Sequence, residues 1–339
     1  MRVAIIGAGL QCQRRAPVIL SSREDKLVVI CGVAAQTTEP MARRFQCESS
    51  LDWRSVVARD DIDAVLICTP PDLHTEIATA ALHRGKHVLC EKPLCRTAEE
   101  ANRIAQMVKD TGRIFKCGFN HRYHPAVLEA KRLADRGDLG RPLFGRCRYG
   151  LIGRPGYENE WRANPERAVG GHLGEQGVHG IDLFRWFFGE ITDVACMTST
   201  QYFSEQPMED NGMATFRMAN GATASLHSSM TQWKNLFSFE VFGEDGYAIV
   251  EGLGGSYGTE SLTWGRRDFT APFSHTTIEY RGGDSSWAAE WKEFATAVRE
   301  GRQPSIGSVA DGVEALRITL ACYESNRSRR FVKVDDIHR

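Results

Sequence analysis

Short apolar runs alternate with amphipathic stretches through roughly the first 120 residues of the chain. Such runs, bounded by turn residues, predict strands at residues 3–6, 27–33, 64–68, 87–90 and 114–117. Apolar positions recur with helical spacing at residues 73–84 and 97–111, and Thr97 with Glu100 forms a capping-box pattern at the start of the second stretch. Strands that alternate with helices predict a doubly wound parallel sheet, so we expect an α/β Rossmann domain over residues 1–120.

The pattern changes after residue 120. One helix is expected at residues 125–136, and alternating apolar and polar positions predict strands at residues 143–149, 193–201, 212–218, 222–230, 236–242 and 248–251. The pairs Asn220-Gly221 and Asp245-Gly246 are hairpin-turn signals between such strands. We therefore expect residues 121–339 to form an α+β domain on a largely antiparallel sheet, with a final helix at residues 308–326 that could pack against either domain.

The composition is that of an ordinary globular protein. Of its 339 residues 42% are hydrophobic and 25% are charged, and this length suggests two domains. The net charge of -1 leaves no excess of cations for phosphates or lipid head groups, which argues against a nucleic-acid or membrane partner. No run approaches about 18 apolar residues, and no targeting segment is expected. The ten scattered cysteines lack metal-binding spacing, so we expect buried free thiols and a cytoplasmic location.

A glycine-rich turn follows the first predicted strand. Gly7, Gly9 and Cys12 form a GxGxxC sequence, with Leu10 and Gln11 between the second glycine and the cysteine. In dinucleotide-binding domains the first glycine permits the tight turn and the second lets backbone amides approach a pyrophosphate. A small third residue lets the helix pack closely on the strand. We therefore expect this turn to bind a nucleotide.

The end of the second predicted strand lacks the acidic residue that usually binds the ribose diol of NAD. Ala34 and Gln36 lie in this stretch instead. The missing acid removes a repulsion against the 2′-phosphate of NADP, which tilts the expectation slightly from NAD toward NADP. A counter-charge could come from one of four arginines, namely Arg14, Arg15, Arg43 or Arg44.

Two stretches carry candidate catalytic residues. The fourth predicted strand ends in Glu91-Lys92-Pro93, which places Lys92 at the carboxyl end of a parallel strand, where such sheets bind ligands. Residues 170–182 form a glycine-rich stretch in which Glu175, His179 and Asp182 would share one face of a helix. A histidine flanked by carboxylates can accept a proton near neutral pH.

Two other interpretations of residues 170–182 stay open at this point. The carboxylates and the histidine could form an ion pair inside a helix that only supports packing. The spacing of His172, Glu175, His179 and Asp182 is also compatible with metal ligands. We expect no metal.

With these residues in place, the chain resembles the Gfo/Idh/MocA family, which includes glucose-fructose oxidoreductase and inositol dehydrogenase. The resemblance covers nearly the whole length and rests on motifs in the family's order. They are GxGxxC, Thr69-Pro70-Pro71 with His74, Glu91-Lys92-Pro93, Gly118-Phe119-Asn120 with Arg122, the glycine-rich approach to His179 and Asp182, and the closing stretch Ala321-Cys322-Tyr323-Glu324-Ser325.

The resemblance implies roles for individual residues. Lys92 belongs to the catalytic set, Pro93 follows a cis peptide bond, and Glu175 stands where the family commonly has Asp. The cofactor-binding residues implied are Gly7, Gly9, Leu10, Gln11, Cys12, Ala34, Gln36, Thr69, Pro70, His74, Glu91, Lys92 and Asn120. The substrate-binding residues implied are Lys92, Asn120, Arg122, Tyr157, Trp161, Arg162, Glu175 and His179.

These observations predict an NAD(P)-dependent dehydrogenase that oxidises a secondary ring hydroxyl of a sugar, glycoside, amino sugar or cyclitol. His179 would take the hydroxyl proton, Lys92 would stabilise the developing alkoxide, and Glu175 would orient His179 or bind a substrate hydroxyl. Carboxylates near Trp161 favour an uncharged or amino-bearing substrate over a sugar phosphate. The resemblance also implies a homodimer or homotetramer. Two alternatives are a non-catalytic nucleotide-binding sensor of the same fold and an NAD-assisted glycosidase.

Overall fold

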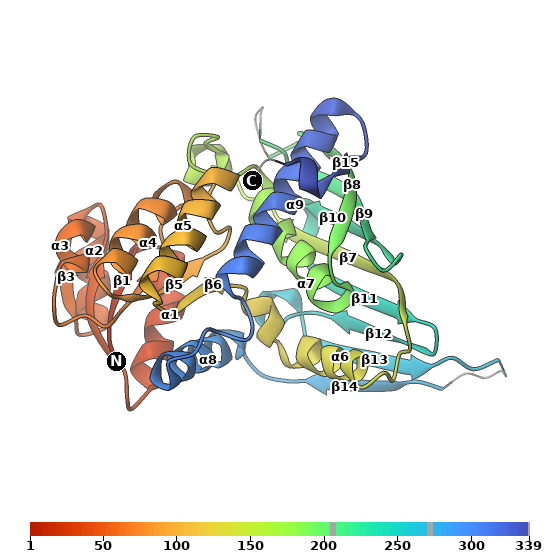
Figure 1. The fold of residues 1–339 in the computed structure, drawn as a ribbon, viewed down its shortest axis with the longest axis horizontal. Helices are drawn as coiled ribbons and strands as arrows, with labels where there is room; N and C mark the ends of the chain where they lie inside the picture. The colour runs from red at the N-terminus through yellow and green to blue at the C-terminus, as the bar shows by residue number, and fades with distance from the viewer. Residues whose placement is uncertain (204–207, 270–273, 338–339) are drawn as a thin grey trace. The chain divides into compact units, whose positions relative to one another are not determined.

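The computed structural model describes residues 1–203, 208–269 and 274–337. The chain divides into two compact units (Figure 1). The first contains Met1–Phe119 and Trp287–Leu316, and the second contains Asn120–Ser286 and Arg317–Arg339. The division falls inside helix α9 (Val309–Ser328), so the first unit takes in a late segment of the chain.

A six-stranded parallel sheet forms the centre of the first unit. In the sheet order β3-β2-β1-β4-β5-β6, the strands are β1 (Arg2–Ile6), β2 (Lys26–Cys31), β3 (Glu48–Ser50), β4 (Ala64–Ile67), β5 (His87–Glu91) and β6 (Phe115–Gly118). The helices are α1 (Leu10–Ser21), α2 (Ala35–Arg44), α3 (Trp53–Val57), α4 (His74–His83), α5 (Ala98–Thr111) and α8 (Ser286–Glu300). The strand order reverses between β1 and β4, and sheets of this kind bind ligands beyond the strand ends at that point.

Burial of the strands explains why they could be predicted from the sequence. Every residue of β4 is buried, and a parallel strand covered on both faces has a continuous apolar run. Helix α5 begins at the predicted capping box, in which Thr97 and Glu100 bond each other's backbone N–H. Helix α8 adds Trp291 and Phe294 to the core of this unit.

The second unit is built on a nine-stranded sheet in the order β14-β13-β12-β11-β7-β10-β9-β8-β15. Its strands are β7 (Pro142–Ile152), β8 (Ile191–Ser199), β9 (Asn211–Met218), β10 (Thr223–Ser229), β11 (Thr231–Gly243), β12 (Gly246–Glu251), β13 (Glu260–Arg266), β14 (Thr276–Tyr280) and β15 (Val332–Lys333). The pair β7 and β10 is parallel and the other pairs are antiparallel. The predicted fold class, a Rossmann sheet followed by a largely antiparallel sheet, is confirmed.

The two faces of this second sheet differ. Helices α6 (Pro125–Asp135), α7 (Val178–Phe188) and the later part of α9 share a buried core with one face, in which Phe184 and Phe239 lie. Exposed and buried residues alternate along β9, so its exposed side chains lie on the other face of the sheet. Met197 and Met213 are 71% and 52% exposed.

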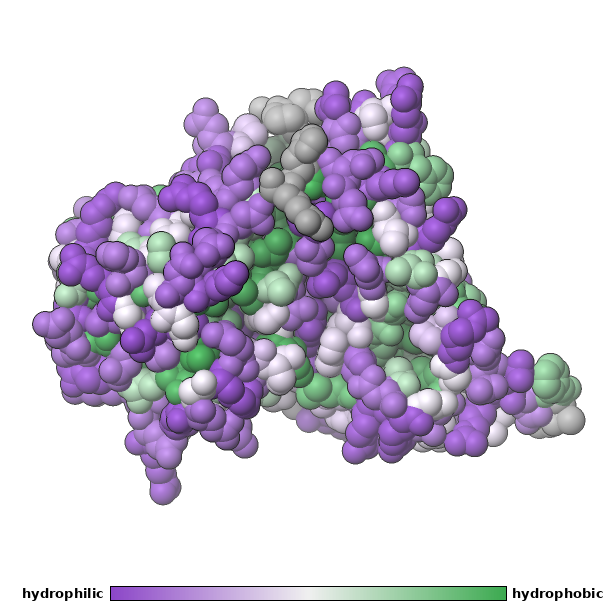
Figure 2. Space-filling view, in the orientation of Figure 1, coloured by the Kyte–Doolittle hydropathy of each residue, from purple (hydrophilic) through white to green (hydrophobic). Residues whose placement is uncertain are grey.

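The visible surface is mostly hydrophilic in Figure 2, with apolar residues scattered among polar ones. In the described parts of the chain, no helix combines the length and the apolar character needed to cross a bilayer.

Candidate active site

The turn from β1 to α1 has the geometry of a dinucleotide-binding turn. Gly7 has a φ of +113°, and a Cβ there would lie 2.5 Å from the Cys68 carbonyl carbon, so only glycine fits. Gly9 is the N-cap residue of α1, and a Cβ there would meet no described atom within 4 Å. The backbone at the start of α1, where Leu10 is 53% exposed, is therefore accessible to a phosphate group.

Polar atoms near this turn also fit a bound dinucleotide. Among the described residues, Gln11 Oε1 and Thr69 Oγ1 are buried and have no hydrogen-bond partner. A buried polar atom without a partner costs about 1–3 kcal/mol, which a bound ligand can offset. Cys12 is fully buried, and burial raises its pKa to about 12, so its thiol is a small packing group. Gly7, Gly9, Gln11 and Thr69 would thus hold NAD.

The stretch after β2 bears on the choice of cofactor. Ala34 precedes α2 in an extended conformation, and Gln36 is exposed in its first turn. Arg43 is exposed and lies 3.4 Å from Glu39, and the exposed Arg44 lies over the Phe45 ring. Arg14 is also exposed, whereas Arg15 is 1% exposed and cannot reach a ribose phosphate.

Arg15 instead joins Glu91 in a buried ion cluster. Its Nε lies 2.8 Å from Glu91 Oε1, and its Nη1 lies 2.5 Å from Glu290 Oε2 on α8. Burial raises the pKa of Glu290, although the Arg15 charge opposes that shift. Removing one member would leave an uncompensated charge in the core. The Glu91 carboxylate therefore fixes the end of β5, directly before Lys92, through contacts within the protein.

His74 joins the loops that follow β4 and β5. Its Nε2 lies 2.8 Å from the carbonyl oxygen of Thr69, and its Nδ1 lies 3.0 Å from that of Pro93. Burial lowers the pKa of His74, which favours the neutral ring. The peptide bond between half-buried Lys92 and Pro93 is cis, as the resemblance implied. His74 thus contacts the loops that carry Thr69, Pro70 and Lys92.

In the second unit, Glu209 holds the glycine-rich loop that leads to His179. Its carboxylate accepts hydrogen bonds from Gly171 N–H at 2.8 Å, Leu173 N–H at 2.9 Å and the Tyr323 hydroxyl at 2.9 Å. A Cβ at Gly171 would lie 1.9 Å from the Glu209 carbonyl oxygen, which explains that glycine. Sequence reasoning missed Glu209, because nothing near it in the sequence indicates these distant partners.

The helix that carries His179 does not begin as an α-helix. Residues Leu173–Gly177 form a π-helical turn, η5, and α7 follows directly. The prediction that Glu175, His179 and Asp182 share one face assumed α-helical spacing, and the π-helical turn changes the angular spacing between Glu175 and the later residues. Such π-helical turns are frequent at functional sites.

The two carboxylates of this stretch bind different arginines. Glu175 Oε1 lies 2.5 Å from Arg162 Nε. Asp182 receives two hydrogen bonds from Arg122, at 2.7 and 2.5 Å, and both side chains are buried. This bidentate pair ties η2 (Asn120–Tyr123) to α7. Arg122 is therefore a structural partner of the His179 helix.

His179 is 2% exposed and lies in a cluster of aromatic rings. The His121 ring stacks on it, with centroids 3.6 Å apart and planes 19° apart. His121 Nε2 lies 2.9 Å from the Tyr149 hydroxyl. Asn120 donates from Nδ2 to Ser286 Oγ at 2.9 Å, so its amide is also used within this unit. His121 was absent from the predicted site, although it lies between Asn120 and Arg122, which were in it.

A loop of the second unit approaches Glu175. Tyr157 in η3 (Tyr157–Asn159) is 3% exposed, and its hydroxyl has no partner among the described residues. Burial and the nearby Glu175 charge raise the Tyr157 pKa, so the phenol keeps its proton. Trp161 is half-buried, with the Arg162 guanidinium 4.5 Å from its ring centre. The protonated phenol of Tyr157 is therefore a buried donor whose partner is not among the described residues.

The structure does not support the metal-ligand interpretation. The described residues contain no group of three or more His, Cys, Asp or Glu side chains arranged to hold a metal ion. The Asp182 carboxylate is bound to Arg122, and His172 Nδ1 lies 2.6 Å from Ser228 Oγ.

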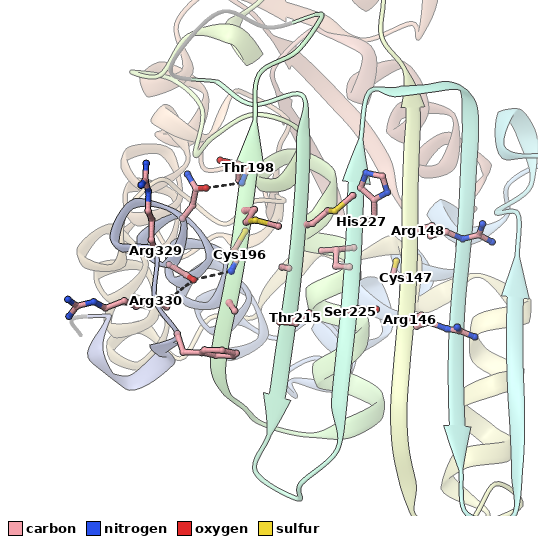
Figure 3. Close-up of a pocket in the computed structure, with 18 of the residues that line it drawn as sticks. Arg146, Cys147, Arg148, Cys196, Thr198, Thr215, Ser225, His227, Arg329 and Arg330 are labelled. Atoms are coloured by element: carbon pink, nitrogen blue, oxygen red, sulfur yellow. Dashed lines mark hydrogen bonds between the residues drawn. The ribbon is translucent and has the colours of Figure 1, made fainter.

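A separate pocket lies on the exposed face of the nine-stranded sheet (Figure 3). Arg146 and Arg148 of β7, His227 of β10 and Cys196 of β8 line it, together with Arg329 after α9. The predicted catalytic, cofactor and substrate residues are not among its lining residues.

Comparison with known proteins identifies relatives along the whole chain. The sequence matches two family models, the oxidoreductase family, NAD-binding Rossmann fold, at residues 1–119, and the GFO/IDH/MocA C-terminal domain at residues 127–249. Levoglucosan dehydrogenase of Pseudarthrobacter phenanthrenivorans is 31% identical over 91% of this chain and 90% of its own. The scyllo-inositol 2-dehydrogenase (NAD(+)) of Bacillus subtilis is 26% identical over 99% of this chain and 96% of its own.

Solved structures agree with these sequence matches. Levoglucosan dehydrogenase in complex with NADH and levoglucosan has a TM-score of 0.88 and 29% identity, and each chain is covered to 99%. The same enzyme in complex with NADH and L-sorbose has a TM-score of 0.89 and 28% identity, again with 99% of each chain covered.

The fold and these matches define an NAD-dependent oxidoreductase that acts on CH–OH groups. The chain belongs to the Gfo/Idh/MocA oxidoreductase family. The predicted family and the predicted reaction class, a sugar or cyclitol dehydrogenase, are confirmed.

Proposed function

We propose that this chain oxidises a secondary ring hydroxyl of an uncharged sugar, glycoside or cyclitol, with Lys92 and His179 in the catalytic site. The observation that carries the proposal is the match over 99% of both chains to an enzyme in complex with NADH and levoglucosan. The positions of the two residues support it. Lys92 follows β5 at the carboxyl edge of the parallel sheet, and His179 is a buried imidazole in the second unit.

In the proposed reaction His179 accepts the proton of the substrate hydroxyl. The Lys92 ammonium stabilises the negative charge that develops on that oxygen. NAD, held by Gly7, Gly9, Gln11 and Thr69, would supply the acceptor for the hydride of the neighbouring carbon. Because Glu175 is bonded to Arg162, we assign it to the substrate side of the site, where it fixes the loop that carries Tyr157.

The charges around that loop favour a neutral substrate. Arg154 lies 2.6 Å from Glu160, and Arg162 lies 3.3 Å from Glu160 and 2.5 Å from Glu175. Within this cluster two carboxylates are paired with two guanidinium groups, so the charges of these four side chains balance. The remaining lone pairs of the carboxylates still accept hydrogen bonds from hydroxyl groups. Because these charges balance, we restrict the proposed substrates to neutral compounds and exclude amino sugars.

A substrate panel tests this proposal. With NAD present, neutral pyranosides, anhydrosugars and inositols are expected to be oxidised with higher kcat/KM than the matching amino sugars or sugar phosphates. Formation of reduced nicotinamide measures the rate for each compound. Turnover confined to sugar phosphates would contradict the charge argument and would assign Arg154 or Arg162 to substrate binding.

The residues after β2 give a second expectation, which concerns NADP. No acid lies between Gly32 and Thr38 to repel a 2′-phosphate, and Arg14, Arg43 and Arg44 are exposed. We therefore propose that NADP binds at least comparably to NAD. Titration of the protein with each cofactor measures the two dissociation constants. A preference for NAD above about tenfold, or roughly 1.4 kcal/mol, would contradict this expectation.

We also propose that the exposed face of the nine-stranded sheet joins copies of this chain into a dimer or tetramer. Met197, Met213 and Phe331 are apolar and 71%, 52% and 67% exposed on or beside this face. Light scattering is expected to give a multiple of the 37.8 kDa protomer mass. Met213→Glu is expected to lower that mass, whereas the control Asn102→Glu on α5 is not. A protomer mass for the unmodified protein would contradict the proposal.

A further inference from the structure

His121 and His179 form a close stack within the second unit. Their ring centroids are 3.6 Å apart, and the residues are only 6% and 2% exposed. His121 belongs to η2 and His179 to α7, so the contact joins two separate elements. Two imidazolium cations at this distance would repel each other strongly where little water screens them. At most one ring of the pair can therefore be charged.

A directional chain of hydrogen bonds sets the tautomer of His121. The Ser286 hydroxyl donates to Asp284 Oδ1 at 2.5 Å, which leaves its oxygen to accept from Asn120 Nδ2 at 2.9 Å. The Asn120 amide is thereby oriented with Oδ1 toward His121 Nδ1, 3.2 Å away. Because a carbonyl oxygen only accepts, the proton of the neutral His121 ring lies on Nδ1.

Tyr149 completes the chain on the other side of the His121 ring. Its hydroxyl lies 2.9 Å from His121 Nε2 and accepts from the Tyr257 hydroxyl at 3.4 Å. Burial raises the pKa of Tyr149, so the phenol keeps its proton and donates it to Nε2. Both nitrogens of His121 are satisfied in the neutral state, and a second proton would break this arrangement.

The groups around the pair are already bound to partners. Polar side chains near the pair have partners of their own, including Arg122 with Asp182, His124 with Glu260, Glu175 with Arg162, and His172 with Ser228. His124 Nε2 also lies 3.8 Å from Asp284. Phe237 of β11 adds an apolar ring 5.7 Å from His121. The two ring nitrogens of His121 thus contact Asn120 and Tyr149, and the rings of His179 and Phe237 lie beside it.

We propose that His121 is a positioning residue for His179. It remains neutral as the Nδ1–H tautomer, fixes the plane of the His179 ring through the stack, and leaves His179 as the proton acceptor of the pair. This inference rests on the proposed function, in which His179 is the base.

Histidine-selective NMR of the full-length protein tests the tautomer. The His121 signals are assigned by their loss in His121→Phe. They are expected to show the Nδ1–H form and no titration across the range in which an ordinary imidazole titrates. In Tyr149→Phe, which removes the donor to Nε2, His121 is expected to titrate or to change tautomer. An Nε2–H ring or a titrating His121 in the unmodified protein would overturn the proposal, as would an unchanged His121 in Tyr149→Phe.

Kinetics test the stack itself. His121→Phe keeps a flat ring against His179, and its kcat is expected to stay within about threefold of the unmodified protein. His121→Ala removes the ring, and kcat is expected to fall about tenfold or more because the base is no longer held in plane. The KM for NAD should be unchanged in both. Equal activity of the two variants would overturn the positioning role.

The proposed catalytic role of His179 and the proposed positioning role of His121 can be tested separately. Full activity of His179→Ala would remove His179 from the reaction, while the NMR result would still report the state of His121. If His121→Ala does not fold, the tautomer measurements on the unmodified protein and on Tyr149→Phe decide the inference.

Discussion

Replacing His179 by alanine is expected to lower kcat by about 10²- to 10⁴-fold, the range for loss of a positioned acid-base group. The reason is that this buried ring of α7 is the proposed acceptor of the hydroxyl proton. The dissociation constant for NAD should change little, because the glycine turn that would hold the dinucleotide lies between β1 and α1. Steady-state kinetics and a cofactor titration measure the two effects.

A matched control distinguishes the specific effect of losing His179 from the general effect of replacing a histidine by alanine. His83 is exposed in the last turn of α4, and His83→Ala is expected to leave kcat unchanged. Thermal unfolding should show that both variants are folded. If folded His179→Ala turned over at nearly the normal rate, His179 would have no part in proton transfer.

Replacing Lys92 by methionine is expected to lower kcat by about 10²- to 10³-fold, the usual cost of removing a group that stabilises a developing oxyanion. Methionine keeps the length and apolar stem of the side chain but carries no charge. The fold should persist, because the end of β5 is held by Arg15 on Glu91 and by His74 on Pro93.

The control for this variant is Lys109→Met, which removes an exposed lysine from the last turn of α5. It is expected to leave both kcat and KM unchanged. A Lys92→Met protein that lost only substrate affinity and kept its kcat would show that Lys92 stabilises the bound substrate and the transition state equally, without a specific contribution to the developing charge.

The sheet of the first unit was predictable because its strands are long enough and buried enough to leave a signal. In β1 four of the five residues are buried, and the apolar run is plain in the sequence. Strand β3 (Glu48–Ser50) has only three residues and none is buried, so it has no apolar pattern. Helix α8 could not be assigned to this unit from the sequence. Trp291 packs in the core of the unit, but it lies far along the chain from residues 1–119, and no local pattern indicates that contact.

The sequence indicates candidate catalytic residues but not the side chains that contact them. Lys92 and His179 are recognisable by their motifs, whereas the ion pair of Arg15 with Glu290 joins residues 275 positions apart. No local pattern connects such residues. The π-helical turn before His179 was also missed, since its glycine-rich sequence is equally compatible with a regular helix.

One assay tests the central claim most directly. The purified protein is incubated with NAD and a neutral pyranoside, anhydrosugar or inositol, while reduced nicotinamide and the sugar product are both quantified. The account predicts one equivalent of reduced cofactor for each ketone formed, and loss of both products in His179→Ala and Lys92→Met. Release of a free sugar without net reduction would indicate an NAD-assisted glycosidase, and tight cofactor binding without turnover of any compound would indicate a sensor. Either result would contradict the account.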